Sequence, residues 1–466
     1  MSTALRHTRF LALIRLAAGR PLCVGRLFTI ALLLVIAGTV AAADPAGTGT
    51  TTDGGVPSTN ASDAAGSAGP SSADAAPRIQ LATIDPGDVY WQRFGHNTLI
   101  VSHSGNDDDA LSFNFGFFDF EQPDFFTRFL EGRMLYQALA LPAPLDLGGY
   151  VEERRSVHLQ SLALTPSQAT RLSDALVKAV QPENRDYLYE YFKANCSTRI
   201  RDALDAALDG AIKQQTIGRS RGYTYRMHAA RLSQGDFWLA TGIDLGLGPN
   251  TDRPLTFWDE MFIPELMRRH LRDVITQDGA PLVAEESAWF DSGEAAPPEL
   301  ATSRSIPFAM TGCAIAIFLL WLAARSRSSP AARRILAWAA AILHLLFGLA
   351  GSILLFLWLG TDHVAAHRNE NLLLLNPLSL LIVPAWIFHR GRPCKFNLTR
   401  DSLAAVLALS AALAFAIKAV PEFSGQANLA WCFLLIPIHL ALAHAWKRLR
   451  AGESSESTAA RKRSLA

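Results

Sequence analysis

Five apolar stretches follow one another in the C-terminal part of this chain, at about residues 306–324, 335–360, 372–389, 402–420 and 429–446. Each is close to the roughly 17–25 residues that cross a bilayer as a helix. Because a backbone inside lipid must satisfy its own hydrogen bonds, a stretch of this kind spans a membrane as a helix. The sequence therefore predicts an all-α domain of five transmembrane helices over residues 306–446.

The connections between these stretches predict their orientation. Arg and Lys gather within residues 325–334, 390–400 and 447–450, whereas the connections "TDHVAAHRNEN" and "PEFSGQAN" are poor in both. By the positive-inside rule, the basic connections face the cytoplasm and the other two lie outside. The chain before the first helix is then exported, and residues 447–466 form a cytoplasmic tail.

The N-terminal part agrees with export. Residues 1–43 join several arginines to the apolar run "LFTIALLLVIAGTV" and to "AAAD", which is typical of a signal peptide or, if uncut, of an anchor. Residues 44–78 are poor in core-forming side chains and predict a disordered linker. Residues 79–300 predict a mixed α and β domain, with strands in "NTLIVSH" and "LSFNFGFF" and a capping box of Thr165 and Gln168. In a bacterium this domain would face the periplasm from the inner membrane.

The exported domain contains one cysteine, Cys196, in "YFKANCSTRIRDAL". A lone cysteine is often a small buried hydrophobe. Here Asn195 is placed as an N-cap, so Cys196 falls in the first turn of a helix, where N–H groups and the helix dipole favour a thiolate. Arg199 and Arg201 add positive charge nearby, although ordinary solvated charges are the simpler interpretation.

A thiolate nucleophile needs a base and a group that orients the base. His96 follows Gly95 at the head of an apolar strand, and glycine permits a close backbone approach there. His103 and His158 compete with it on composition alone. Asn114, polar within an aromatic strand, is our inference for the third group, and a strand-edge amide is its simpler interpretation.

Polar side chains also crowd the outer ends of the second and third apolar stretches: Asp362, His363, His367, Asn369, Asn371 and Asn376. Asn376 precedes Pro377 inside an apolar stretch, where an amide without a partner is costly. We expect these residues to bind lipid head groups beneath the thiol. His363 and His367 are spaced as metal ligands can be, but no third ligand can be placed, so we predict neither a metal nor another cofactor.

The order of these motifs resembles the circularly permuted papain-like enzymes, which include the lecithin:retinol acyltransferase group and its NlpC-type relatives. "FGHNTLIV", "FNFGFFDFEQPDFFTRFLEGRMLY", "PENRDYLYEYFKANCSTRIRDAL" and "GIDLGLGPNTDRPLTFWDEMFIPELM" resemble the periplasmic domain of the Lnb-type lipoprotein N-acyltransferases. "TDHVAAHRNENLLLLNPLSL" resembles part of the five-helix membrane domain attached to it. The resemblance spans about residues 79–446 and implies an α+β, circularly permuted papain-like exported domain.

The resemblance implies that Cys196 is the nucleophile and His96 its general base. Asn195 could lend its amide to an oxyanion site, although capping the helix is its simpler role. The implied reaction moves an acyl chain from a phospholipid, through a cysteine thioester, to the amine of a diacylglyceryl lipoprotein. With water as the acceptor, the same site would be a phospholipase or thioesterase.

Two further alternatives stay open. One is a cysteine peptidase or amidase acting on cell-wall peptide. The other is a non-catalytic membrane protein that binds a lipid or a protein. The formal net charge of +1 gives no reason to expect a nucleic acid as a partner.

Overall fold

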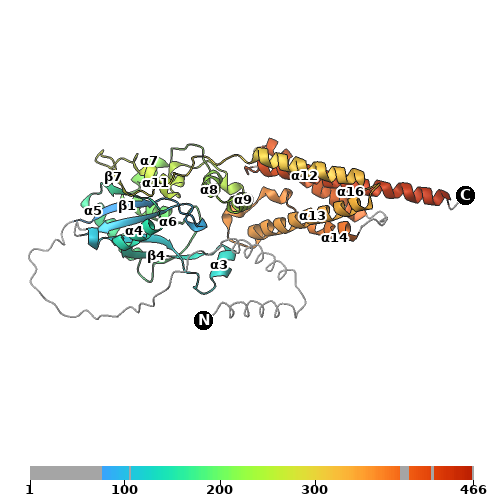
Figure 1. Ribbon diagram of the computed structural model, residues 1–466. Helices are drawn as coiled ribbons and strands as arrows, with labels where there is room; N and C mark the ends of the chain where they lie inside the picture. The colour runs from blue at the N-terminus through green and yellow to red at the C-terminus, as the bar shows by residue number, and fades with distance from the viewer. Residues whose placement is uncertain (1–75, 104–106, 389–397, 421–424, 464–466) are drawn as a thin grey trace, which may run out of the picture. The chain divides into compact units, whose positions relative to one another are not determined.

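The computed structural model describes residues 76–103, 107–388, 398–420 and 425–463, which belong to one compact unit, Pro70–Ala466. The predicted leader, and the predicted linker as far as residue 75, lie outside the described residues. We call the described residues 76–300 the sheet domain and residues 305–463 the helical domain (Figure 1).

The sheet domain is built on one antiparallel sheet of seven strands in the order β6-β4-β3-β2-β1-β5-β7. Two of the strands, β2 and β3, are those predicted from "NTLIVSH" and "LSFNFGFF", and they pair with Thr98 opposite Asn114. The strands are β1 (Arg78–Ile84), β2 (His96–Ser102), β3 (Leu111–Phe117), β4 (Leu135–Pro142), β5 (Val157–Leu162), β6 (Asp186–Leu188) and β7 (Val283–Phe290).

Helices surround this sheet, and α6 packs against β2 and β3 with α5 beside it (Figure 1). As predicted, α5 begins at Pro166 behind a capping box formed by Thr165 and Gln168. Ile200 and Leu204 of α6 are fully buried against the sheet core. The helices are α3 (Phe125–Glu131), α4 (Ala143–Glu152), α5 (Pro166–Ala179), α6 (Cys196–Ala207), α7 (Ala211–Thr216), α8 (Tyr225–Ser233), α9 (Phe237–Gly246), α10 (Phe257–Glu260) and α11 (Pro264–Leu271).

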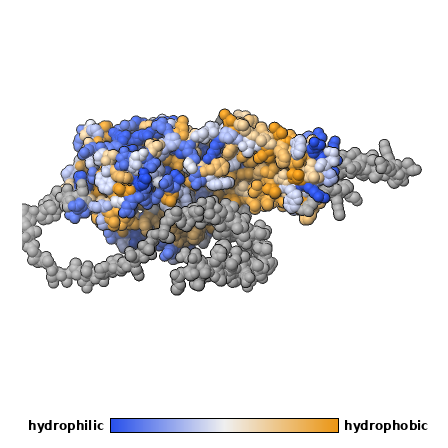
Figure 2. Space-filling model, viewed as in Figure 1, coloured by the Kyte–Doolittle hydropathy of each residue, from blue (hydrophilic) through white to orange (hydrophobic). Residues whose placement is uncertain are grey.

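The helical domain consists of α12 (Ser305–Arg325), α13 (Pro330–Leu359), α14 (Ser379–Phe388), α15 (Leu398–Ala416) and α16 (Leu429–Arg463). Within the described residues, four helical segments are long and apolar enough to cross a membrane: 305–325, 330–359, 400–419 and 429–449. Figure 2 shows hydrophobic residues gathered on the surface of this domain.

The third predicted span, residues 372–389, differs from the prediction. Residues Glu370–Leu373 form a 3-10 turn, and the α-helix begins only at Ser379. Pro377 lacks a backbone N–H, and the carbonyl of Asn376 accepts from Ser379 N at 2.9 Å, so the chain turns here before the helix starts. In the described residues α14 therefore has 10 residues, fewer than the roughly 17 that a span requires.

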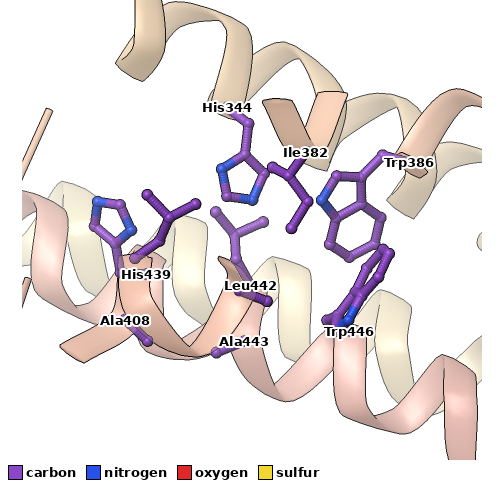
Figure 3. A pocket seen from close by; sticks show the side chains of 10 residues that line it. His344, Ile382, Trp386, Ala408, His439, Leu442, Ala443 and Trp446 are labelled. Atoms are coloured by element: carbon purple, nitrogen blue, oxygen red, sulfur yellow. The ribbon is translucent and has the colours of Figure 1, made fainter. Parts of the chain in front are cut away.

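Inside the helical domain, a small pocket lies among α13, α14, α15 and α16 (Figure 3). The polar groups of its lining come from His344, His439, Trp386 and Trp446, and leucine, isoleucine and alanine side chains supply the rest. The Nε2 of His439 contacts the carbonyl of Leu374 at 2.7 Å. These histidines were not among the predicted site residues.

Candidate active site

Cys196 is the first residue of α6, and Asn195 is its N-cap. The Asn195 side chain accepts from the Thr198 N–H at 2.9 Å, and the Thr198 hydroxyl accepts from the Asn195 N–H at 2.9 Å. This reciprocal capping box starts the helix at the cysteine, as the sequence predicted. The thiol is only half-buried, so a substrate can reach it, and it lies at the positive end of the helix dipole.

His96 is the first residue of β2 and follows Gly95, which has φ +80°. A side chain at Gly95 would come within 2.7 Å of the Ile84 carbonyl, so this position requires glycine. Next to the histidine, Asn97 accepts a 2.7 Å hydrogen bond from the Ser197 hydroxyl. This buried bond fixes the start of β2 against the start of α6, which brings the imidazole to the thiol.

The His96 imidazole lies between the thiol and Asn114. Its Nε2 is 2.8 Å from Oδ1 of Asn114, and because an amide oxygen can only accept, Nε2 carries the proton. The remaining ring nitrogen, Nδ1, is left for Cys196. The structure thus brings together the three residues that we proposed as nucleophile, base and orienting group, in a continuous row.

Asp146, on α4, continues this row. Its Oδ2 accepts from Nδ2 of Asn114 at 2.8 Å and also from the Ser112 hydroxyl. Because a carboxylate can only accept, it holds the NH₂ of Asn114 toward itself and leaves the amide oxygen facing His96. Asp146 was not among the predicted site residues, and the one signal for it in the sequence is a lone acid within "LPAPLDLGGY".

Charge couples the thiol to the imidazole. Burial opposes ionisation of Cys196, but the charge and hydrogen bonding of His96 and the backbone N–H groups of Asn97 and Ser197 outweigh it, so the pKa of the thiol is lowered. Burial also lowers the pKa of His96, yet the charge of Cys196 and its hydrogen bonds to Cys196 and Asn114 raise it overall. Opposite shifts of this kind favour transfer of the thiol proton to the imidazole.

Tyr187, on β6, is a second residue that the sequence analysis missed. Its hydroxyl is buried and, within the described residues, has no hydrogen-bond partner. A Cβ at Gly116 would lie 3.9 Å from this hydroxyl and 3.7 Å from Cβ of Cys196, so the hydroxyl and the cysteine both lie beside this glycine. Burial and the charge of Cys196 raise the pKa of Tyr187, which keeps its proton available for donation.

The Asn195 amide is already occupied. Its Nδ2 donates to the carbonyls of Phe262 at 2.8 Å and Tyr191 at 3.1 Å, which uses both hydrogens. The contacts therefore favour the capping role over the oxyanion role that we also predicted for Asn195. The Tyr187 hydroxyl has no partner among the described residues, so its hydrogen, unlike those of the Asn195 amide, can be donated to a substrate oxygen.

The two competing bases have other partners, and of the two arginines Arg199 packs on Tyr187 beside the thiol site. Nε2 of His103 contacts the Ser173 hydroxyl at 3.4 Å, and Nε2 of His158 contacts Oδ2 of Asp85 at 3.4 Å. The Arg199 guanidinium lies 4.5 Å from the centre of the Tyr187 ring. Arg201 is buried rather than solvated, and it donates to the Trp258 carbonyl at 2.9 Å.

The polar loop after α13 does not form a single cluster. Asp362 pairs with Arg133, with Nε and Oδ2 2.6 Å apart. The ring of His363 is 2.9 Å from the Phe129 carbonyl and stacks on Tyr191, with a centroid distance of 6.0 Å. These two residues therefore face the aromatic side of the sheet domain.

The remaining loop residues have structural partners. Nδ2 of Asn369 donates to the carbonyls at the end of α9, at 2.8 Å to Leu245, and Asn371 donates to the same carbonyl at 3.2 Å. Asn376 accepts from the Leu378 N–H at 3.0 Å, and His367 contacts the Thr361 carbonyl at 3.0 Å. The structure therefore does not bring all six predicted lipid contacts to the thiol.

Both connections predicted to lie outside contact the sheet domain. Besides Asn369, Gln426 donates to the Leu247 carbonyl at 3.1 Å, and Trp431 at the start of α16 donates to Asp244 at 2.9 Å. These two connections and the sheet domain therefore lie on one side of the helices.

The geometry thus defines a membrane protein in which an antiparallel sheet domain carries a paired thiol and imidazole. Residues 72–231 match the family described as the Lnb N-terminal periplasmic domain, and residues 304–448 match the Lnb transmembrane domain. The chain belongs to the Lnb family, as a membrane protein with a periplasmic domain. No curated protein and no solved structure matches it.

Proposed function

We propose that this protein is a membrane-bound thiol acyltransferase. It would move an acyl chain from a phospholipid, through a thioester on Cys196, to an amine. The observation that carries the proposal is the row from Cys196 through His96 to Asn114, with the thiol at a helix N-terminus. The chain order, in which the strand of His96 precedes the helix of Cys196, supports the circularly permuted papain-like fold that we predicted.

In the first half-reaction, the Cys196 thiolate attacks the ester carbonyl of a phospholipid. A C–S bond forms, the ester C–O bond breaks, and the imidazolium of His96 gives its proton to the departing alcohol of the lysophospholipid. The Tyr187 hydroxyl would donate to the negative oxygen that develops on the carbonyl carbon.

In the second half-reaction, an amine attacks the thioester carbonyl. An N–C bond forms, the C–S bond breaks, and the now neutral His96 takes the proton that the amine releases. Asn114, fixed by Asp146, would keep the imidazole in one tautomer through both steps. The acceptor that we propose is the α-amino group of an S-diacylglyceryl cysteine at a lipoprotein N-terminus.

The site fits substrates that stay in a membrane. Both the donor and the acceptor carry acyl chains, and the sheet domain with its thiol is followed in the chain by helices that are apolar enough to span a bilayer. We propose the bacterial inner membrane as the location, with the thiol on the periplasmic side. Of the six loop residues, His363 is the one that we retain as a substrate contact, because it stacks on Tyr191 of the sheet domain.

The test uses the full chain in proteoliposomes that contain a phospholipid with a labelled acyl chain. A diacylglyceryl peptide with a free α-amine is the acceptor, and the same peptide with a blocked amine is its matched control. We expect label on the free-amine peptide, none on the blocked peptide, and none on either peptide with the Cys196→Ser variant.

Two results would contradict the proposal. Release of free fatty acid without any peptide acylation, at saturating acceptor, would identify a phospholipase or thioesterase. Labelling of the peptide by the Cys196→Ser variant at the native rate would remove the thiol from the reaction.

A further inference from the structure

The segment around α3 exposes an unusual number of phenylalanines. Phe126 is 69% exposed, Phe120 is 51% exposed and Phe129 is 41% exposed. Their rings pack on their neighbours, with 5.1 Å between the centroids of Phe120 and Phe125. We call this surface the aromatic ledge, and it consists of Phe117, Phe118, Phe120, Phe125, Phe126 and Phe129. Exposed apolar surface of this kind marks an interaction site.

Three contacts join the ledge to the loop that follows the C-terminal end of α13. Asp362 donates its N–H to the Glu131 carbonyl at 2.7 Å, Arg133 pairs with Asp362 at 2.6 Å, and His363 contacts the Phe129 carbonyl at 2.9 Å. Gly132 follows α3 with φ +78°, and a Cβ there would come within 2.7 Å of the His363 nitrogen. The backbone of the ledge thus touches the loop as closely as a glycine allows.

This attachment fixes the height of the ledge relative to a bilayer. The apolar helix α13 ends at Leu359, and residues 360–362 separate that end from His363. Because each residue spans at most about 3.6 Å, His363 lies within about 15 Å of the end of the membrane helix, and its side chain contacts the ledge at the Phe129 carbonyl. Trp and Tyr are enriched at this depth, where the hydrocarbon meets the head groups, and phenylalanines on an apolar face insert into the same boundary.

A row of rings leads from the ledge into the sheet domain. Phe118 lies 5.0 Å from Tyr136, and Tyr136 lies 4.2 Å from Tyr189, centroid to centroid. Tyr136, Tyr189 and Cys196 all pack against the same buried core. An acyl chain lying along these rings would therefore reach the neighbourhood of the thiol without crossing water.

We propose that the aromatic ledge lies in the outer leaflet of the bilayer and guides phospholipid acyl chains toward Cys196. The position of the ledge stands on its own contacts, whereas the guiding role rests on the proposed function. The occupant that we propose is lipid because the ledge is joined to the end of a membrane helix, where apolar side chains insert between the head groups and the acyl chains.

Site-specific photocrosslinking tests the position. A benzophenone amino acid replaces Phe126 in the full chain, in vesicles of phosphatidylethanolamine and phosphatidylglycerol. Leu409 on α15, 71% exposed, is the lipid-facing reference, and Val177 on α5, 44% exposed, is the control within the sheet domain. We expect phospholipid adducts at positions 126 and 409 and none at position 177.

Absence of a lipid adduct at position 126, with one at position 409, would overturn the proposal. A crosslink from position 126 to a protein instead of lipid would also overturn it, and would make the ledge a protein-docking surface.

Activity tests the guiding role. Phe126→Asp should slow the acylation of Cys196 by bilayer phospholipid about tenfold, since charge at the interface opposes insertion, whereas Phe126→Leu should keep most of the rate. Equal rates for the two variants would overturn the guiding role. Lipid adducts at position 126 in a protein that never acylates Cys196 would leave the ledge in place and refute the proposed function alone.

Discussion

The thiol centre and the polar loop after α13 contain similar residue types but connect them differently. At the thiol centre, side chains bond to other side chains, from Asp146 through Asn114 to His96. In the loop, Asn369 and Asn371 donate to backbone carbonyls of α9, and their amide oxygens accept from Gln426 and Asn428, so these bonds end on the backbone rather than on a reactive group. A row of side chains ending at an accessible thiol can move protons, whereas amides bound to carbonyls hold two segments together. We therefore assign the reaction to the thiol centre, and we assign to the loop the role of holding the helical domain against the sheet domain.

His96→Ala should have the largest effect on the thiol centre. We expect acyl transfer to fall about 1000-fold, since general-base catalysis contributes roughly 10²–10⁴. Loss of the imidazolium should also raise the pKa of Cys196, which His96 lowers. Iodoacetamide should therefore modify native Cys196 at lower pH than it modifies the variant, as measured by peptide mass mapping. Identical pH profiles would show that the two groups are not paired.

Tyr187→Phe sharpens the assignment of the oxyanion donor. Removing one such donor costs about 10²–10³ in kcat, so we expect acylation of Cys196 to slow by about 100-fold with little change in KM. The phenyl ring retains the packing of Tyr187 against Phe115. Asn195→Asp keeps the cap but removes the amide donor, and is the matched variant. A larger loss of kcat in folded Asn195→Asp than in Tyr187→Phe would return the oxyanion role to Asn195.

Asp146→Asn should have a smaller effect, because Asp146 positions Asn114 and does not touch the reacting atoms. A hydrogen bond to a charged group is worth about 1.5–3 kcal/mol, so we expect kcat to fall about tenfold or somewhat more. The hydrogen bond of Asn114 helps to raise the pKa of His96, so a loosened Asn114 should lower that pKa, and the variant should lose activity at a lower pH than the native protein does. Asp146→Glu should restore part of the rate. An unchanged pH profile would reduce Asp146 to a structural residue.

Asn371→Ala tests the docking side of the comparison. Asn371 is fully buried, and its loss would leave the Asn428 amide without its 2.8 Å acceptor. A buried polar group without a partner costs about 1–3 kcal/mol, so the temperature of thermal unfolding in detergent should fall. Asn376→Ala, at a half-exposed position, should shift it less. Transfer activity per folded molecule should stay near the native value, and a severe loss in Asn371→Ala would assign it to the lipid site.

Local signals predicted part of this site. The cap at Asn195, the helix starting at Cys196 and the strand starting at His96 depend on neighbouring residues, so the sequence was sufficient. Asn114 lies beside His96, as we inferred, because β3 pairs with β2.

Other parts depend on contacts between distant segments. Asp146 reaches Asn114 from a helix, and Tyr187 approaches the thiol from the sheet edge, so neither has a motif of its own. The docking of Asn371 onto α9 joins residues that are 126 positions apart. For the same reason, the sequence predicts one lipid site for the polar loop, whereas the structure divides its residues between contacts to α3 and contacts to α9.

The most direct measurement of the central claim is the intact mass of the protein after brief mixing with phospholipid vesicles and no acceptor. The proposed function predicts a gain of one acyl group, mapped to Cys196, that hydroxylamine removes and that a free-amine diacylglyceryl peptide discharges. The Cys196→Ser variant should gain no such labile group. An unmodified Cys196 under conditions in which the native protein acylates the peptide would contradict the thioester mechanism.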